Sequence, residues 1–211
     1  MPVPDPVKIF HITHGENLPS IIETGALMSK SESTDISTTS VAYEDIQDRR
    51  AATQVTIGPK GILHDYVPCY FAPRSPMLFA VHSGDAGGQS DQRAIIHLVS
   101  TVNEIEHHAC EFIFTDGHAI MNLSEFFEDP SQLTHVDWNV MSSEYWNDTD
   151  KDPDRKRRRQ AEFLVHQKLP WTAIQRIGVV SDEIADRVRE IMERCDASHR
   201  PKVLTKPEWY Y

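Results

Sequence analysis

The centre of the predicted fold is the stretch Arg155-Lys156-Arg157-Arg158-Arg159-Gln160-Ala161-Glu162-Phe163-Leu164-Val165-His166. It sets one carboxylate, Glu162, between five consecutive cations and the apolar residues 163–165. This apolar segment, which ends before Leu169-Pro170, is typical of a short buried strand. A carboxylate at the start of such a strand loses favourable hydration, so it is found there when it is paired or used in chemistry. Glu162 is therefore the candidate catalytic residue.

The same spacing also fits a plainer interpretation, in which Glu162 balances the preceding arginines at the protein surface. Exposed pairs of this kind are common and contribute little to stability. The two interpretations differ in the burial of Glu162, and the spacing of the residues leaves both open.

The composition predicts one globular domain. The chain has 211 residues, of which 39% are hydrophobic and 25% charged, and this fits a single domain over residues 1–211. Its first residues lack the basic and apolar regions of a secretory signal, and no apolar run approaches the ~18 residues that span a bilayer. The three cysteines, Cys69, Cys110 and Cys195, are widely spaced, as in proteins with reduced thiols and no zinc ribbon. We therefore expect a cytoplasmic monomer that makes no membrane contact.

The charge of the chain is unevenly distributed. The net charge of −11 argues against a polyanionic partner, because like charges repel during approach. Residues 104–154, however, hold thirteen acidic side chains and one lysine, whereas residues 155–159 are all cations. A local run of this kind can guide a short segment of nucleic acid to one site, although many such runs are only solvated faces.

Hydrophobic periodicity and turn residues predict a mixture of short strands and helices. Strands or extended segments are expected at residues 7–13, 62–71, 94–99, 112–114, 163–165, 177–180 and 203–204. Helices are expected between Asn17 and Gly25, over 41–53, after Ser75-Pro76, and from Ser181 to about Cys195, with a loop at 30–40 and a turn at 84–89. Residues 115–154 show little periodicity beyond a possible helical turn at Phe126-Phe127, which is typical of a functional loop. The pattern predicts an α+β domain.

The first strand ends in a polar cluster. His11, Thr13 and His14 fall where this strand meets the first helix, a junction that favours phosphates because backbone N–H groups and the helix dipole point at it. The spacing His11-x-x-His14 could be half of a metal site, but no nearby cysteine or carboxylate completes it. We predict no metal site.

Several motifs in register resemble the DarT family, and the resemblance is colinear over nearly the whole chain. The motifs are Phe10-His11-Ile12-Thr13-His14 with Asn17-Leu18, Ile46-Gln47-Asp48-Arg49-Arg50, His64-Asp65-Tyr66-Val67-Pro68 with Tyr70-Phe71, Pro73-Arg74-Ser75-Pro76-Met77-Leu78, Phe114-Thr115-Asp116-Gly117-His118, and Arg159-Gln160-Ala161-Glu162-Phe163-Leu164-Val165.

The resemblance implies a fold and an activity. The fold would be the ADP-ribosyltransferase fold, a split mixed sheet resembling the catalytic domain of poly(ADP-ribose) polymerases. The activity would be that of a bacterial toxin that transfers ADP-ribose from NAD to a base in single-stranded DNA, with thymidine preferred and guanine second. The partner would be a DarG-like antitoxin whose macrodomain removes the modification.

The resemblance also assigns residues. It puts His11 and Thr13 against NAD, with Asn17 and Leu18 nearby and Tyr70 close to the nicotinamide. It makes Arg50 the family arginine, although the sequence does not separate Arg50 from Arg49. Candidates for DNA contact come from the substrate-reading loop of these transferases, residues 118–160, and from one residue outside it: Arg74, His118, Tyr145, Trp146, Arg155, Lys156, Arg157, Arg158 and Arg159.

The chemistry gives Glu162 two tasks. Breaking the bond from nicotinamide to ribose builds positive charge on the sugar, which a carboxylate stabilises. A ring nitrogen that carries a proton, such as N3 of thymine, needs a general base before it can attack. Two alternatives remain open from the sequence: a transferase of the same fold that acts on RNA or protein, and a catalytically silent module that binds single-stranded nucleic acid. Nicotinamide release would distinguish the silent module, and direct labelling would identify the acceptor.

Overall fold

The computed structural model describes residues 1–33, 39, 44–84 and 91–211. Most of the loop predicted at 30–40, the first residues of the helix predicted at 41–53 and most of the turn predicted at 84–89 lie outside the described residues. The described part of the chain is a mixed α+β structure, which confirms the predicted class.

Twelve strands and seven α-helices are described. The strands are β1 Lys8–His14, β2 Ala26–Met28, β3 Gln54–Val55, β4 Gly61–Ile62, β5 Tyr66–Tyr70, β6 Ile95–Thr101, β7 Phe112–Thr115, β8 Phe126–Phe127, β9 Glu162–His166, β10 Lys168–Pro170, β11 Arg176–Val179 and β12 Lys202–Thr205. The helices are α1 Leu18–Thr24, α2 Glu44–Ala52, α3 Pro76–Ser83, α4 Val102–His107, α5 Trp138–Ser142, α6 Arg155–Arg159 and α7 Asp182–Arg194.

Eight strands form one sheet in the order β12-β11-β6-β1-β5-β9-β7-β8. All neighbours are antiparallel except β11 and β12, which are parallel, so the sheet is mixed. β1 pairs with β6 along its whole length, but it pairs with β5 only through Phe10 and Tyr70. The sheet therefore splits between β1 and β5, and this split leaves room for a cavity.

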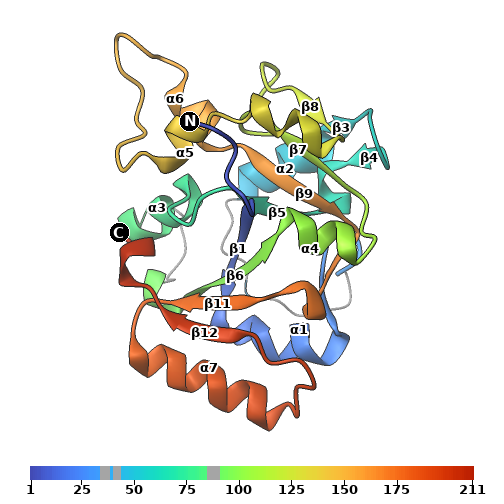
Figure 1. The fold of residues 1–211 in the computed structure, drawn as a ribbon, viewed down its shortest axis with the longest axis vertical. Coiled ribbons are helices and arrows are strands. Elements are labelled where there is room, and N and C mark those ends of the chain that lie inside the picture. Colours follow the sequence, from blue (N-terminus) through green and yellow to red (C-terminus); the bar gives the residue numbers. More distant parts are fainter. Residues whose placement is uncertain (34–38, 40–43, 85–90) are drawn as a thin grey trace.

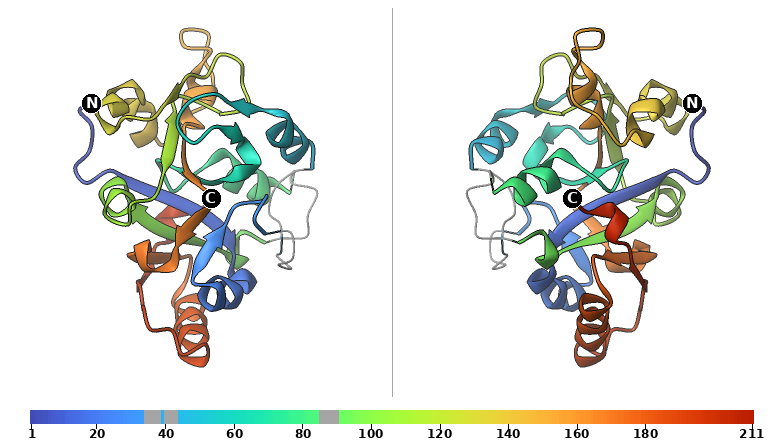
Figure 2. Two further views of the ribbon diagram at one scale, coloured as in Figure 1. Left: turned by 90° about the vertical axis from the view of Figure 1, so that its right-hand side faces the viewer. Right: turned by 90° about the vertical axis from the view of Figure 1, so that its left-hand side faces the viewer.

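The helices cover the sheet unevenly (Figures 1 and 2). α1 and α7 lie side by side at one end of the long axis, whereas α5 and α6 lie at the other end. Ile21 of α1 and Val188 of α7 pack in the main core with Leu98 of β6 and Ile177 of β11. Within the described residues, no helix combines the length and the apolar character needed to cross a bilayer.

Local signals set the ends of several helices as predicted. Oγ of Ser75 accepts from the N–H of Leu78, and Pro76 begins α3. Oγ of Ser181 accepts from the N–H of Ile184 at the start of α7. Gly25 ends α1 with a positive φ of 71°, a conformation that glycine adopts without a steric penalty.

The segment 115–154 was predicted as a long loop, and this prediction is wrong in two places. Phe126–Phe127 is strand β8, which pairs with β7, and not a turn of helix. Its aromatic residues are typical of strands, but two residues are too few to show a period. Trp138–Ser142 is helix α5, capped by Asp137, whose carboxylate accepts from the N–H groups of Asn139 and Val140.

Gly178 of β11 generates a prediction about stability. A Cβ atom at this position would lie 2.2 Å from Cζ3 of Trp209. The same ring packs edge-on against Phe10 and His97, at centroid distances of 5.3 and 5.4 Å, so it has little room to move. We expect Gly178→Ala to destabilise the fold by about 1–3 kcal/mol. A thermal melt should then show a midpoint lower by about 2–4 °C for each kcal/mol.

The control for this prediction is the same change in a Trp209→Ala background. The added methyl group then has space, so the loss should be much smaller. An equal loss in both backgrounds would contradict the steric explanation.

Candidate active site

Glu162 begins β9 and is 2% exposed, so its carboxylate lies inside the protein. Its Oε2 accepts a hydrogen bond from Nη1 of Arg50 at 2.7 Å, and its Oε1 accepts one from the backbone N–H of Ala119 at 3.1 Å. Its own N–H donates to Oγ1 of Thr115 at 3.0 Å. The interpretation in which Glu162 balances the neighbouring arginines at the surface is therefore wrong, and the buried, paired interpretation is confirmed.

Arg50 reaches Glu162 from the last turn of α2 and is 7% exposed. Among the residues that the structure describes, its buried Nη2 has no hydrogen-bond partner. Such an N–H group has lost its hydration without compensation, so it is available to an acceptor that enters the site. Arg49 is exposed instead, and its Nη2 donates to the carbonyl of Ile120 at 3.4 Å. The geometry separates the two arginines that the sequence left equivalent.

A cavity of about 570 Å³ opens beside Arg50, whereas Glu162, its partner in the ion pair, is not among the residues that line it. It is lined by residues of β1, α2 and β5 and by residues of the segment 146–160. Eight of the candidates predicted from the sequence line it: His11, Thr13, Asn17, Arg50, Tyr70, His118, Trp146 and Lys156. Candidates for NAD and for DNA therefore meet at one cavity.

His11 is held as a neutral side chain on the cavity wall. Its Nδ1 donates to the carbonyl of Pro68 at 2.7 Å, and burial lowers the pKa of its imidazole to about 4. A neutral imidazole with Nδ1 as the donor keeps Nε2 as an acceptor for a ligand. The described parts of the chain hold no group of three His, Cys, Asp or Glu residues that could bind a metal ion.

Asn17 links two other residues of the cavity wall, Thr13 and Thr39, by hydrogen bonds. Its Nδ2 donates to Oγ1 of Thr13 and to the carbonyl of Thr39, both at 3.0 Å, and its Oδ1 accepts from the N–H of Thr39 at 2.8 Å. It stands at the N-cap position of α1, as predicted, but its side chain makes no capping hydrogen bond. Leu18 is fully buried in the core and does not line the cavity, so the structure does not bring it to the other NAD candidates.

Two further side chains surround the carboxylate. Tyr70 lies opposite Glu162 on the neighbouring strand, and burial together with the charge of Glu162 raises the pKa of its phenol. Tyr70 therefore stays a protonated donor. Burial lowers the pKa of His118, whereas the charge of Glu162 opposes this shift, and the charges of the two arginines of α2 add to it. Both side chains can make neutral hydrogen bonds to a ligand.

The aromatic candidates of the segment 145–146 have different environments. Trp146 is 6% exposed, and its Nε1 donates to the hydroxyl of Tyr211 at 3.2 Å. Tyr145 is 79% exposed and does not line the cavity. Arg74 lies over the ring of Tyr211 at 4.4 Å, also outside the cavity lining. Trp146 alone of these three forms part of the wall.

The basic run is helix α6, and most of it is neutralised by the chain itself. Arg157 pairs with Asp116 and Asp154, and Arg158 pairs with Asp137, Asp152 and Asp154. Arg159 is 4% exposed and donates to the carbonyls of Val140, Met141, Ser143 and Arg74. Arg155 donates to the carbonyl of Tyr145, and Lys156 lines the cavity. The run is therefore not a free cationic patch, because aspartates of the same segment surround it.

Two of the groups that hold Glu162 were not predicted from the sequence. The donor from Ala119 is a backbone N–H, which the residue type does not reveal. Thr115 is a residue type common in strands, so its hydroxyl does not stand out in the sequence. The motif Phe114-Thr115-Asp116-Gly117-His118 marked this region as part of the resemblance. Only the pairing of β7 with β9 brings it to the carboxylate.

Comparisons with known proteins agree on one family. A sequence model described as "ssDNA thymidine ADP-ribosyltransferase, DarT" matches residues 10–211. The DNA ADP-ribosyl transferase of Thermus sp. (strain 2.9) is 39% identical over 99% of this chain and 98% of its own length. The DNA ADP-ribosyl transferase of Escherichia coli O127:H6 is 30% identical over 99% of this chain and 95% of its own length.

Solved structures agree with the sequence comparisons. The structure of Thermus sp. 2.9 DarT in complex with ADP-ribosylated ssDNA superposes with a TM-score of 0.95 at 38% identity, covering 100% of this chain and 99% of the other. The structure of the same protein in complex with NAD+ superposes with a TM-score of 0.91 at 35% identity, covering 100% of both chains.

The buried ion pair predicts different results for the two arginines of α2. Arg50→Met leaves the carboxylate of Glu162 buried without its charged partner, which commonly costs about 3–5 kcal/mol. We expect a large loss of unfolding free energy in urea. Arg49→Met is the control, because its side chain is exposed and its one backbone contact is long, and it should stay close to wild type. Equal losses in both variants would contradict the assignment of Arg50 as the partner.

Proposed function

The chain belongs to the DarT family of ssDNA thymidine ADP-ribosyltransferases, and from this membership we propose how its site works. It is an NAD-dependent DNA ADP-ribosyltransferase. We propose that the acceptor is a thymine base in single-stranded DNA and that the chain acts as a single domain. The observation that carries the mechanism is the buried pair of Glu162 and Arg50, in which one guanidinium nitrogen has no partner among the described residues.

We propose that NAD occupies the cavity against His11, Thr13, Asn17, Arg50 and Tyr70. Its volume falls within the ~300–1,000 Å³ that is typical of small-molecule sites. The neutral His11 and the protonated Tyr70 offer an acceptor and a donor to the amide and hydroxyl groups of NAD. Lys30 also lines the cavity and can offset part of the charge of the two phosphates.

Glu162 has two roles in the proposed reaction. Its charge stabilises the positive charge that develops on the ribose as the bond to nicotinamide weakens. It also takes the proton from N3 of thymine. The freed electron pair of N3 forms the bond to C1′ of the ribose, and the bond from C1′ to nicotinamide breaks with its electron pair going to nicotinamide. A carboxylate accepts up to about four hydrogen bonds, so the two that hold Glu162 leave it able to react.

Arg50 assists the same step from the other side. Its Nη1 fixes Oε2 of Glu162, and its free Nη2 is available to a carbonyl oxygen of the base. As N3 loses its proton, negative charge spreads to the carbonyl oxygens of thymine, where a fixed cation stabilises it. The pair thus acts on both reactants, Glu162 on the sugar and the proton, and Arg50 on the base.

For the DNA strand, we propose contacts with Arg74, His118, Tyr145, Trp146, Arg155 and Lys156. An aromatic ring offers a stacking surface to a base, and the cations offer pairing to phosphates. Arg157, Arg158 and Arg159 are not part of this proposal, because each guanidinium group makes several contacts with carboxylates or carbonyls of the chain. Arg155 makes fewer, one hydrogen bond to the carbonyl of Tyr145 at 2.7 Å and an ion pair with Asp152 at 3.8 Å. The positive charge available to DNA is therefore much smaller than the run of five cations suggests.

We also propose a partner and a location. A relative from Thermosipho africanus is a "DNA ADP-ribosyl transferase-DNA ADP-ribosyl glycohydrolase fusion protein", 27% identical over 87% of this chain. In that protein one chain combines the two activities. We infer that this enzyme is the toxin of a pair whose DarG-like macrodomain antitoxin removes the modification. We place the toxin in the cytoplasm, where its DNA substrate lies.

The test is mass spectrometry of nucleosides from a mixed-sequence oligonucleotide incubated with enzyme and NAD. We expect ADP-ribosylated thymidine from the wild type. Glu162→Gln keeps the shape of the side chain but removes its charge and basicity, so the rate should fall about 100-fold or more. Glu111→Gln is the control, because this carboxylate is exposed and outside the cavity, and it should keep full activity.

Other products would change the proposal in different ways. Modified guanosine would correct the acceptor base. Modified RNA or protein with untouched DNA would overturn the acceptor class, and a wild-type enzyme that releases no nicotinamide would overturn the activity itself. Full activity in Glu162→Gln would contradict the role of this carboxylate.

Lys156 generates a second prediction about the DNA strand. Each phosphate contact with single-stranded DNA contributes about 0.7 to the slope of log affinity against log salt. We expect Lys156→Ala to reduce this slope by about that amount and to raise the KM for DNA more than the KM for NAD. Lys168→Ala is the control, since Lys168 is exposed on β10 and does not line the cavity. A rise confined to the KM for NAD would assign Lys156 to the NAD phosphates instead.

A further inference from the structure

We propose that Arg157 is a positioning residue for Glu162, acting through a loop that holds one oxygen of the carboxylate. The loop consists of residues 116–125 between β7 and β8, and we call it the anchor loop. This inference rests on the proposed function, because it takes Glu162 as the catalytic carboxylate. The contacts that carry it involve none of the groups proposed to bind NAD.

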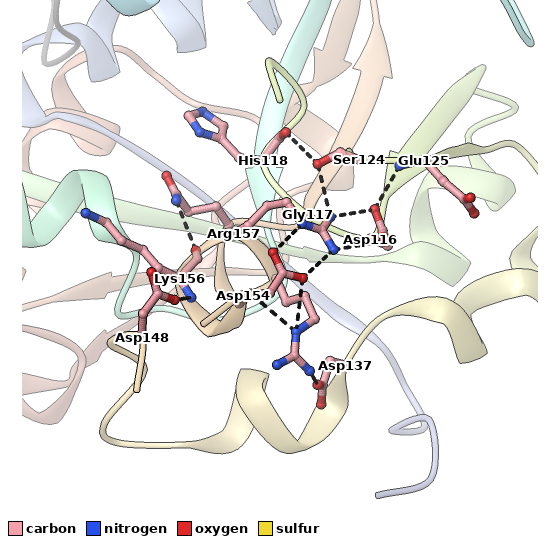
Figure 3. A network of polar contacts seen from close by, with 12 residues as sticks. Asp116, Gly117, His118, Ser124, Glu125, Asp137, Asp148, Asp154, Lys156 and Arg157 are labelled. Atoms are coloured by element: carbon pink, nitrogen blue, oxygen red, sulfur yellow. Dashed lines mark hydrogen bonds and ion pairs between the residues drawn. The ribbon is translucent and has the colours of Figure 1, made fainter. Parts of the chain in front are cut away.

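Arg157 uses all three guanidinium nitrogens on side chains of the chain itself (Figure 3). Nε and Nη2 donate to the two oxygens of Asp154, both at 2.8 Å. Nη1 and Nη2 donate to the two oxygens of Asp116 at 3.1 and 3.3 Å, and Nη1 also donates to Oγ of Ser124 at 3.1 Å. These contacts, with the hydrogen bond to Asp154 first, raise the pKa of Arg157. Paired contacts of this kind fix geometry as well as charge.

The partners of Arg157 close the anchor loop at both ends. Oδ1 of Asp116 accepts from the N–H of Glu125 at 2.9 Å, and Oγ of Ser124 donates to the carbonyl of His118 at 2.8 Å. The carbonyl of Arg157 itself accepts from the N–H of His118 at 3.0 Å. Arg157 therefore contacts the beginning, the middle and the end of the loop (Figure 3).

The middle of the anchor loop reaches the active site. The N–H of Ala119 donates to Oε1 of Glu162 at 3.1 Å, and its neighbour His118 lines the cavity. Just before the loop, Oγ1 of Thr115 accepts from the N–H of Glu162 at 3.0 Å and donates to the carbonyl of Gly117 at 2.6 Å. A shift of the loop would remove the donor to Oε1 while Arg50 still holds Oε2. The carboxylate would then lose one of its two fixed points.

Gly117 lets the guanidinium lie directly on the loop backbone. A Cβ atom at this position would lie 2.2 Å from Nη1 and 2.9 Å from Cζ of Arg157. The end of a free arginine could move away from such a contact. Here it cannot move without breaking its hydrogen bonds to Asp116 and Ser124. Glycine is therefore required at position 117 for the guanidinium to stay in place.

These contacts predict an effect on the chemical step more than on NAD binding. A misplacement of about 1 Å in a catalytic group can lower the rate about 100-fold. Of the residues proposed to hold NAD, His11, Thr13, Asn17 and Tyr70 lie on or beside β1, and Arg50 meets the network only through Glu162. We expect kcat for transfer to fall and the Kd for NAD to stay unchanged.

The main experiment compares Asp116→Asn with Asp137→Asn. Both changes are isosteric, and both aspartates are 21% exposed and pair with an arginine of α6. Only Asp116 belongs to the anchor loop, and Asp137 caps α5, which asparagine also does. We expect Asp116→Asn to lower kcat about 10- to 100-fold at saturating NAD and oligonucleotide. Asp137→Asn should keep the wild-type kcat.

Two further variants separate positioning from charge. Gly117→Ala keeps every charge but displaces the guanidinium, so it should lower kcat as Asp116→Asn does. Arg157→Lys keeps the positive charge but lacks the planar fork, and should also lower kcat. Loss of DNA attraction cannot explain these results, because Gly117→Ala and Arg157→Lys leave the net charge unchanged and Asp116→Asn makes it less negative. Thermal melts and NAD binding of each variant report whether the fold is kept.

Two outcomes would overturn the inference and leave the proposed function intact. The first is a wild-type kcat in folded Asp116→Asn and Gly117→Ala while Glu162→Gln is inactive. The second is an equal loss of kcat in Asp137→Asn, which would show that the ion pairs act only through general stability. If the wild type yields no ADP-ribosylated DNA at all, the proposed function fails instead, and the two failures are thereby distinguished.

Discussion

The buried ion pair between Glu162 and Arg50 is the constraint on which the rest of the structure depends. A carboxylate at the start of a central strand loses its hydration, and it is stable there only when a cation and additional donors compensate. Two distant segments supply this compensation: α2 brings Arg50, and the loop after β7 brings the N–H of Ala119. Thr115 of β7 accepts from the backbone N–H of Glu162 and so fixes the start of β9. The sheet must bring β7 next to β9 and leave room for α2 over the same face.

The split in the sheet lies next to this ion pair. β1 and β5 share only the pair Phe10 and Tyr70, and the cavity is lined by Tyr70, which lies opposite Glu162, and by Arg50. On the closed side of β9, Phe163 and Val165 pack in the main core. The alternation along β9 therefore joins a rigid apolar support to a reactive carboxylate. The unpaired Nη2 of Arg50 is tolerable in this arrangement because it lies where a substrate can complete it.

The sequence predicts those helices and strands whose positions depend on the pattern of neighbouring residues. The strand after Glu162, the caps Ser75 and Ser181 and the helix end at Gly25 follow from residue type and period, and the structure confirms them. The ion pair does not follow, because Arg50 and Glu162 are separated by 112 positions and two adjacent arginines fit the motif equally well. Strand β8 and helix α5 are too short to show a period: β8 is defined by its pairing with β7, and α5 begins at the cap of Asp137.

The contacts of the segment 116–159 also change the interpretation of the basic run, residues 155–159. Five consecutive cations in an acidic chain look like a binding surface for a polyanion, but the acidic residues of the preceding segment are their partners. Asp116, Asp137, Asp152 and Asp154 neutralise Arg157 and Arg158, and backbone carbonyls surround Arg159. Four of the thirteen acidic residues of 104–154 and two arginines of α6 therefore belong to one internal network. In the proposed reaction, the DNA strand meets a site with few free cations, so shape, stacking and the ion pair have to supply the recognition that long-range attraction does not.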